Sequence, residues 1–305
     1  MIAERRENKS TDKISIMNSN EFTLNPAYYG IPDQQQLKDL RIWSDHYHGF
    51  AGGLKQHKEM MFYVERMGIE KVISLDIGSI EEDALVPSPI DNEEREILEK
   101  NKNKILGIIR IDPGYPKESC AKMEKWIRNG PCIGIKFLLQ KDGISCSHPN
   151  SDAIIRLAGE LGAAIYIHSW LKVGGTPRSP GGGRSPGEAT PMDVALLAKR
   201  FPNVPMICGH SGGDWELGAR AIRPYENVLF EFAGSYPHSG SVDYAVNELG
   251  ADRIVWGCHG PSRSYATELS KVLDASISHS DRMKVFGGNY RRTWAKLLKE
   301  KGIPT

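Results

Sequence analysis

The chain has 305 residues, 39 of them basic and 38 acidic, so its formal net charge at pH 7 is +1. This balance excludes a general attraction to nucleic acid or anionic lipid, and it favours a small-molecule substrate. Hydrophobic residues make up 40% of the chain and charged residues 25%, which is ordinary globular usage and excludes extensive disorder. The length suits one large domain with a single core.

The cysteines and the first residues bear on the cellular compartment. The five cysteines are an odd number without CxxC spacing, which favours reduced thiols and therefore a cytoplasmic protein. The first residues are polar and lack the apolar core of a signal peptide, and no apolar stretch has the length needed to span a bilayer. We therefore expect no membrane partner, while a homo-oligomer stays open.

Short apolar runs alternate with amphipathic helical patterns along the chain. The runs span residues 41–46, 71–78, 105–112, 133–139, 163–169, 204–213, 227–234 and 252–260. The helical patterns span residues 54–67, 91–102, 117–128, 151–161, 190–200, 241–249 and 265–276. Apolar runs between helices are typical of parallel strands buried on both faces. We therefore predict a single-domain (β/α)8 TIM barrel over residues 39–300 after a polar N-terminal extension, residues 1–38, with an open doubly wound sheet as the alternative.

Five histidines fall at the ends of predicted strands. His46 and His48 lie two apart at the end of the first strand, so the period of two turns both imidazoles the same way. His168, His210 and His259 end the fifth, sixth and eighth strands, and in a closed barrel these ends converge. Imidazole is a common metal ligand, and a catalytic site typically has three protein ligands and a water. The cluster therefore predicts a divalent metal site, which His46, His48 and His168 could supply.

Six motifs in fixed order extend this interpretation. They are SDHYHG (44–49), GIKF (134–137), YIHS (166–169), ICGHSGGDWE (207–216), WGCHGP (256–261) and FGGNYRRTW (286–294). With them the sequence resembles the amidohydrolase superfamily, in its amidohydrolase-related branch of hydrolases, lactonases and decarboxylases, over about residues 40–300. The resemblance implies a barrel, a divalent metal held by His46, His48 and His168, and a His210 that orients or polarises the substrate. Zinc is the expected ion, with manganese as the alternative.

One position departs from the family pattern. The family usually carries an aspartate at the end of the eighth strand, in a stretch like WGSDxP, where it binds the metal and takes the proton from the attacking water. This chain has Cys258 and His259 there. A neutral imidazole has one acceptor nitrogen, whereas a carboxylate has two acceptor oxygens. His259 is therefore a candidate catalytic base or metal ligand, and its presence puts catalysis in question.

Five further residues are candidates for binding the substrate. Lys136, on the fourth strand, is expected to contact the substrate or a buried carboxylate, although some superfamily members carboxylate a lysine there to bridge two metals. Arg178 and Arg184 lie in the Gly/Pro-rich residues 174–191, which we expect to overhang the barrel mouth, where they could clamp an anion or simply be solvated. Glu231 could point inward and bond a histidine or a hydroxyl, or pair with an arginine. Trp170 could wall the pocket or pack against the overhanging segment.

These expectations leave three functions open. The first is a metal-dependent hydrolase that cleaves a C–O or C–N bond, in a lactone, ester or amide, of a small polar and anionic substrate. The second is a non-oxidative decarboxylase that uses the same metal to hold a carboxylate. The third is a binding barrel without turnover, in which His259 has replaced the essential base.

Overall fold

The strands form one parallel sheet whose spatial order follows the chain. The computed structural model describes residues 32–79, 83–138, 144–171, 187–234 and 238–305. The chain divides into two units, Met1–Asp33 and Gln34–Thr305, and the strands of the described residues lie in the second. The strands are β1 (Trp43–Tyr47), β2 (Lys71–Ile77), β3 (Ile105–Ile111), β4 (Gly134–Phe137), β5 (Ala164–Ile167), β6 (Met206–Cys208), β7 (Val228–Phe232) and β8 (Ile254–Trp256).

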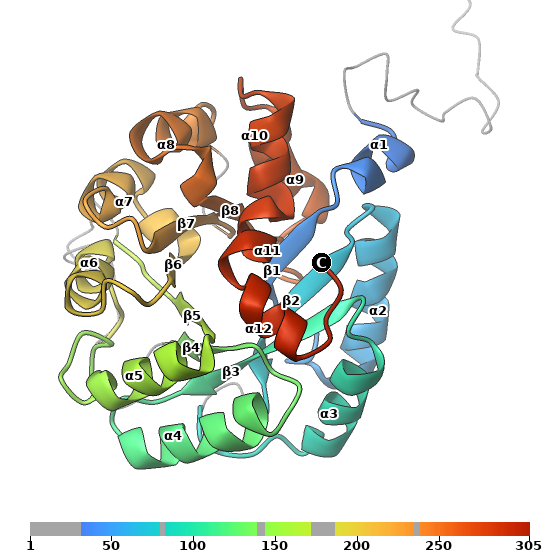
Figure 1. Cartoon of the computed structure of the whole chain (residues 1–305). Helices are drawn as coiled ribbons and strands as arrows, with labels where there is room; N and C mark the ends of the chain where they lie inside the picture. The colour runs from blue at the N-terminus through green and yellow to red at the C-terminus, as the bar shows by residue number, and fades with distance from the viewer. Residues whose placement is uncertain (1–31, 80–82, 139–143, 172–186, 235–237) are drawn as a thin grey trace, which may run out of the picture. The chain divides into compact units, whose positions relative to one another are not determined.

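Helices follow the strands and surround them on the outside (Figure 1). They are α1 (Gln34–Asp39), α2 (Gly53–Arg66), α3 (Asp91–Lys100), α4 (Pro116–Met123), η2 (Glu124–Arg128), α5 (Ser151–Leu161), α6 (Pro191–Arg200), η4 (Gly209–Gly212), α7 (Trp215–Ile222), α8 (Ser241–Leu249), η5 (Ala251–Arg253), α9 (Tyr265–Leu273), α10 (His279–Met283), η6 (Lys284–Gly288), α11 (Asn289–Thr293) and α12 (Ala295–Glu300). Helix α1 lies partly within residues 1–38, the segment expected to be the extension. None of the described helices has the length and apolar character that crossing a membrane requires.

The sheet closes between its first and last strands. Asp45 of β1 and Gly257, just after β8, form a parallel bridge, and the Cys258 amide donates to the Asp45 carbonyl oxygen at 3.3 Å. A side chain at Gly257 would collide with the Asp45 carboxylate, so only glycine allows this approach. The predicted (β/α)8 barrel is confirmed, and the open-sheet alternative is wrong.

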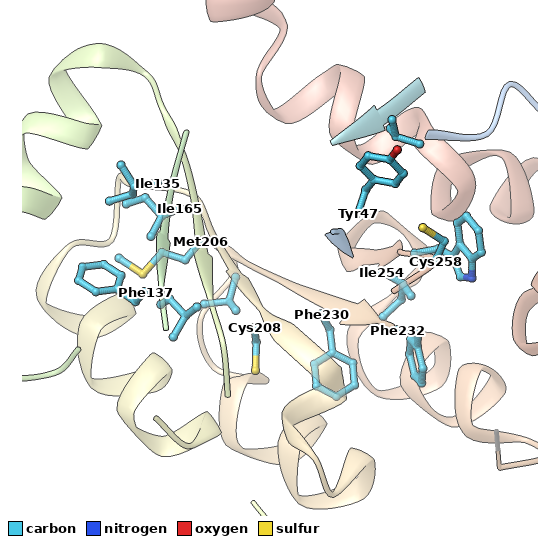
Figure 2. Close-up of a cluster of buried hydrophobic side chains, with 14 of the residues drawn as sticks. Tyr47, Ile135, Phe137, Ile165, Met206, Cys208, Phe230, Phe232, Ile254 and Cys258 are labelled. Atoms are coloured by element: carbon cyan, nitrogen blue, oxygen red, sulfur yellow. The ribbon is translucent and has the colours of Figure 1, made fainter. Parts of the chain in front are cut away.

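Alternate side chains of each strand face the surrounding helices. Ile135, Phe137, Ile165, Phe230 and Phe232 point outward in this way and belong to one continuous buried cluster with the helices (Figure 2). The residues between them face the barrel interior, as the period of two requires. The outward faces therefore supply most of the core. The inward faces form the barrel interior, which includes the candidate site at its carboxyl end.

Apolar side chains close the amino end of the barrel interior. Trp43 at the start of β1 and Leu229 of β7 share a second buried cluster with Tyr290 of α11 and with Trp294 and Leu298 near α12. These two helices lie across the strands in Figure 1. The interior is therefore packed at this end, as barrel interiors usually are, and only the carboxyl end is available for chemistry.

The sixth unit differs from the expectation. Instead of a strand over residues 204–213, β6 ends at Cys208, because His210 and Ser211 adopt left-handed backbone with φ of 56° and 52°. Helix α7, which the sequence patterns did not predict, then begins after Asp214, whose carboxylate accepts from the Leu217 amide at 2.9 Å. The turn places His210 beyond the strand, inside the barrel mouth.

Candidate active site

Three of the five histidines have unusual backbone. His46, His210 and His259 have φ of 57°, 56° and 49°. Left-handed backbone costs about 1–2 kcal/mol for a residue with a Cβ, and such outliers gather at functional sites. The turns bring the rings together: the His46 ring centroid lies 5.0 Å from that of His48, 4.4 Å from His210 and 4.2 Å from His259.

Two overlapping sets of side chains could hold a metal ion. Ligand atoms of His46, His48 and His259 all lie within 4.8 Å of one another, and so do ligand atoms of His46, His210 and Glu231. Among the described residues, no such set includes His168. The structure thus brings together the paired histidines of β1 and the histidine that follows β8, and it leaves His168 beside His210.

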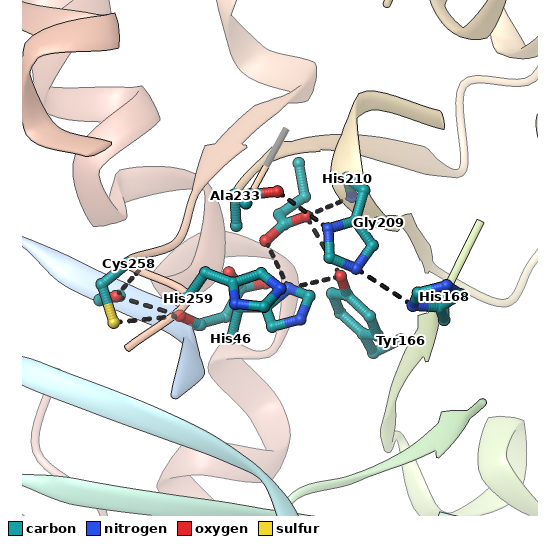
Figure 3. A network of polar contacts seen from close by, with 12 residues as sticks. His46, Tyr166, His168, Gly209, His210, Ala233, Cys258 and His259 are labelled. Atoms are coloured by element: carbon teal, nitrogen blue, oxygen red, sulfur yellow. Dashed lines mark hydrogen bonds and ion pairs between the residues drawn. The ribbon is translucent and has the colours of Figure 1, made fainter. Parts of the chain in front are cut away.

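Glu231 and Tyr166 fix the His46 ring. The Nδ1 atom of His46 lies 3.1 Å from Glu231 Oε1 and 2.7 Å from the Tyr166 hydroxyl (Figure 3). Because that hydroxyl donates to Glu231 Oε2 at 3.2 Å, it accepts from Nδ1–H of His46. The Nε2 lone pair of His46 is left for a ligand, which is the carboxylate–histidine–metal arrangement of many metal sites.

His48 and His259 also have polar partners near Nδ1. Asp76 Oδ2 lies 3.5 Å from Nδ1 of His48. The Ser262 hydroxyl donates to the His259 carbonyl oxygen at 3.0 Å and therefore accepts from Nδ1–H of His259, 2.5 Å away. Hydrogen bonds thus hold His46 and His259 at Nδ1, and the Asp76 carboxylate lies near Nδ1 of His48. With protons at Nδ1 the three imidazoles keep their Nε2 lone pairs, so the set suits a divalent ion such as zinc or manganese.

His168 makes a different pair of contacts. Its Nδ1 lies 3.1 Å from His210 Nε2 (Figure 3), and its Nε2 lies 2.9 Å from Glu188 Oε1. His210 in turn donates from Nδ1 to the Ala233 carbonyl oxygen at 2.9 Å. The Trp170 ring stands edge-on to His210, with centroids 5.5 Å apart. Nδ1–H of His168 therefore donates to His210 Nε2, Nε2 of His168 lies next to the Glu188 carboxylate, and Trp170 packs against the cluster.

Burial keeps these imidazoles neutral. It is the largest cause that lowers the pKa of each of the five histidines, followed for His46 by the neighbouring His210. The pKa of His259 falls to about 3, again through burial first and His48 second. Neutral imidazole is the form that binds metals.

Charged groups lie beneath the histidines inside the barrel. Burial raises the pKa of Asp45 to about 7, and burial together with Asp45 raises that of Glu231 well above its usual value. Burial and then the Arg110 guanidinium lower the pKa of Lys136 to about 7, while Asp76 and Glu231 oppose that change. Lys136 Nζ lies 5.4 Å from the Tyr166 ring centroid. Lys136 is thus buried among carboxylates below the histidines.

Sequence reasoning missed four residues that hold the histidines: Asp76, Tyr166, Glu188 and Ser262. Tyr166 precedes His168 by two positions on β5, so the strand period could have identified it. Glu188 carried no such signal, because a parallel bridge between Ser169 and Ala189 brings it to His168. Two predicted residues, Arg178 and Arg184, lie outside the described residues.

Comparison with known proteins identifies relatives of the chain. A family model described as Amidohydrolase matches residues 71–296. That match begins after β1, so the assignment of His46 and His48 to the site depends on the geometry. No curated protein shows significant similarity to the sequence.

Solved structures with the same fold include several decarboxylases. The 2,6-dihydroxybenzoate decarboxylase from Rhizobium has 16% identity and a TM-score of 0.63, over 83% of this chain and 98% of the other. The 5-carboxyvanillate decarboxylase from Novosphingobium aromaticivorans was solved with manganese and 4-hydroxy-3-methoxy-5-nitrobenzoic acid. It has 19% identity and a TM-score of 0.59, over 78% of this chain and 79% of the other. A dihydroxybenzoic acid decarboxylase from Polaromonas, with manganese and 2-nitroresorcinol, has 16% identity and a TM-score of 0.61, over 85% of this chain and 98% of the other. At these identities the likeness shows the fold.

Proposed function

The chain belongs to the amidohydrolase family, and from that premise we propose that it is a metal-dependent, non-oxidative decarboxylase of a small hydroxylated aromatic acid. His46, His48 and His259 would hold the ion through Nε2. When bound, the ion supplies a Lewis acid that holds the anionic groups of the substrate and offsets the negative charge left when carbon dioxide departs. The contacts of the site residues support this choice over hydrolysis.

The observation that carries the proposal is the hydrogen bonding of His259. Its Nδ1 donates to Ser262, so Nε2 is its only acceptor, and a ligand at Nε2 uses that acceptor. No acceptor is then left at this position for the proton of an attacking water. An aspartate, with two oxygens, could do both. Decarboxylation does not require that water to be deprotonated, so it suits the site better than hydrolysis.

The carboxylates near the histidines do not replace the missing base. Glu231 contacts His46, Asp76 contacts His48, and each carboxylate thereby orients a ring. Such contacts set the tautomer and the direction of the lone pair before a ligand arrives. Their role is therefore to preorganise the metal site, and using one of them as a base would release the ring that it holds.

The charge of the barrel interior suits an acidic substrate. Lys136 and Arg110 are buried on neighbouring strands, where they pair in register on β4 and β3. After burial, both groups lower the pKa of His48 and His168, so their positive charge acts on the histidine cluster. Two of the similar decarboxylases were solved with nitro-substituted phenols and manganese, which also supports an aromatic acid and makes manganese a serious alternative to zinc.

The test measures carbon dioxide release by protein loaded with manganese or with zinc. The substrates are 2,6-dihydroxybenzoate, 5-carboxyvanillate and related hydroxybenzoates, compared with a set of lactones and esters. We expect a hydroxybenzoate to lose carbon dioxide, with the phenol formed in equal amount, and His46→Ala/His48→Ala to abolish the reaction. The exposed His279→Ala is the matched control and should retain it. Lactone or ester cleavage without decarboxylation would contradict the proposal.

The hydrolase is the second candidate, and the family description favours it. In that reaction His210 would polarise the scissile carbonyl only after gaining a proton at Nε2, because its Nδ1–H already donates to the Ala233 carbonyl oxygen. His259→Asp separates the candidates, because it supplies the missing second acceptor. A hydrolase that is limited by His259 should gain lactonase or esterase activity. A binding barrel would turn over no substrate as the wild type, and activity that appears only in the variant would identify it.

A further inference from the structure

A buried ion pair lies on helix α9, outside the histidine cluster. Lys271 Nζ donates to Glu268 Oε2 at 2.8 Å, and each side chain is only 1% exposed. Removing two charges from water is costly, and well-packed apolar side chains of similar volume often stabilise a protein equally well or better. Stability alone therefore does not explain this pair, and the other contacts of Glu268 indicate a second role.

Glu268 also holds the peptide group between Ala233 and Gly234, which we call the β7 peptide group because it lies just after β7. Its Oε2 atom accepts from the Gly234 amide at 3.1 Å. The carbonyl oxygen of the same peptide group, that of Ala233, accepts from His210 Nδ1–H at 2.9 Å (Figure 3). A peptide group is a rigid plane, so orienting its N–H also orients its carbonyl oxygen. A single peptide group thus connects the carboxylate on α9 to a histidine of the site.

The contact with Ala233 determines which nitrogen of His210 carries the proton. A neutral imidazole has one N–H and one lone pair, and a carbonyl oxygen can only accept, so the proton lies on Nδ1. The lone pair lies on Nε2, which accepts from Nδ1–H of His168 at 3.1 Å. Hydrogen bonds in a chain polarise one another, so a carboxylate at the N–H makes the carbonyl oxygen a stronger acceptor. The tautomer of His210 therefore depends on how the β7 peptide group is held.

The same peptide group supports the ring of His259. Gly234 has φ of 65°, and a Cβ there would lie 2.0 Å from Cδ2 and 2.7 Å from Nε2 of His259. The ring edge that carries Nε2 therefore lies against the Gly234 backbone. Glu268 is anchored to β8 as well, because its carbonyl oxygen accepts from Trp256 Nε1 at 2.7 Å. Helix α9 thus holds the ends of β7 and β8 beside His259.

We propose that Glu268, paired with Lys271, is a positioning residue of the site. By holding the β7 peptide group it keeps His210 in its Nδ1–H tautomer and sets the position of the His259 ring. The part of this inference that concerns His259 rests on the proposed function, in which His259 binds the metal. The part that concerns His210 needs no metal, because the tautomer is a property of the protein alone.

The experiment compares double variants that remove both buried charges. Glu268→Gln/Lys271→Met keeps an oxygen that can accept from the Gly234 amide. Glu268→Leu/Lys271→Met fills the same space without an acceptor, and Glu268→Ala/Lys271→Met also lacks the acceptor but leaves more room. Thermal unfolding verifies that the metal-free variants are folded, which we expect because apolar replacement of a buried pair is often well tolerated. The Gln/Met and Leu/Met variants then differ in one hydrogen bond.

Two measurements report on the two histidines. Nitrogen-15 NMR of the metal-free protein identifies the protonated nitrogen of His210, whose signals are assigned by their loss in His210→Ala, and competition with a chelating dye gives the zinc affinity. The Gln/Met variant should keep the Nδ1–H tautomer of the wild type and bind zinc within about threefold of it. Both variants without the acceptor should show a mixture of tautomers and bind zinc about tenfold more weakly, as expected when a residue that orients a ligand is lost.

The outcomes separate this inference from the function itself. If the variants without the acceptor match the wild type in both measurements, the ion pair serves stability alone and the inference is overturned. It is also overturned if the Gln/Met variant is impaired as strongly as the Leu/Met variant, because the hydrogen bond to Gly234 would not be the cause. If the wild type does not bind zinc, the proposed function fails, and the tautomer of His210 alone then decides the inference.

Discussion

The two ends of the barrel interior are built from the same eight strands but have opposite properties. At the amino end, Trp43, Tyr290 and Trp294 pack in a buried apolar cluster. At the carboxyl end, His46, His210 and His259 have left-handed backbone and lie over buried carboxylates. The amino end uses ordinary packing, and the carboxyl end accepts strained backbone and buried charge. Stability and chemistry are therefore separated along the barrel axis.

This separation explains why strained histidines can be tolerated. Three left-handed residues cost a few kcal/mol together, at about 1–2 kcal/mol each. Burying one large aromatic side chain contributes about as much as two such residues cost. The difference also makes the two ends experimentally distinguishable, because a change at one end should affect unfolding and a change at the other should affect ligand binding.

The largest effect is expected at the amino end. Trp294→Ala removes a large buried side chain and should lower the free energy of unfolding by about 3–5 kcal/mol, because the deletion leaves a cavity in the apolar cluster at the amino end of the barrel. Zinc affinity, measured at a temperature where the variant is folded, should change little. Trp294→Phe is the control and should cost less. A loss of zinc affinity in folded Trp294→Ala would mean that the two ends are coupled.

The next effect is expected where backbone approaches a histidine. Gly234 has φ of 65°, and a Cβ there would overlap the His259 ring. Gly234→Ala should therefore displace His259, weaken zinc binding by about 10- to 100-fold and destabilise the fold by about 1–2 kcal/mol. Gly240→Ala is the matched control, because its φ of 74° is similar and a Cβ there meets no atom within 4 Å. Equal zinc affinities in the two variants would contradict the assignment of His259 as a ligand.

Much of the fold could be predicted from the sequence, because most strands after β1 are compact apolar runs between polar segments. The histidines were found because they lie in the last residues of these strands or just beyond them. Helix α7 was missed because the apolar run was extended through Gly213, beyond the left-handed turn at His210 that follows β6. Glu188 could not be found, because a bridge between residues 20 positions apart brings it to His168.

A smaller effect is expected from the carboxylate that orients His48. In Asp76→Asn the amide can donate to Nδ1 of His48, which favours the tautomer whose proton lies on Nε2, the wrong one for a metal. Zinc affinity should fall by about tenfold, with little change in unfolding. Asp274→Asn, at an exposed position after α9, should behave as the wild type. Unchanged affinity in Asp76→Asn would exclude a role for this carboxylate in the metal site.

The smallest effect concerns the buried carboxyl of Glu94 in α3, which contacts the backbone just after β2. Glu94 accepts from the Gly78 amide at 2.9 Å, and burial raises its pKa to about 7. The unfolded chain loses this proton at lower pH than the folded chain, so stability should fall as the pH rises from about 4.5 to about 7. Glu94→Gln removes that dependence and should raise stability at pH 8 by about 1–2 kcal/mol, with no gain at pH 4. Urea unfolding at both pH values measures it, and an equal gain at both would contradict the assignment.

The most direct test of the metal site is X-ray absorption at the zinc edge of zinc-loaded protein, which identifies the atoms bound to the ion. The account predicts about three imidazole nitrogens at roughly 2.0–2.1 Å, with one oxygen ligand and no sulfur. His259→Ala measured in parallel should lose one imidazole from that shell. A shell without imidazole, or one that His259→Ala leaves unchanged, would contradict the claim that His46, His48 and His259 form the metal site.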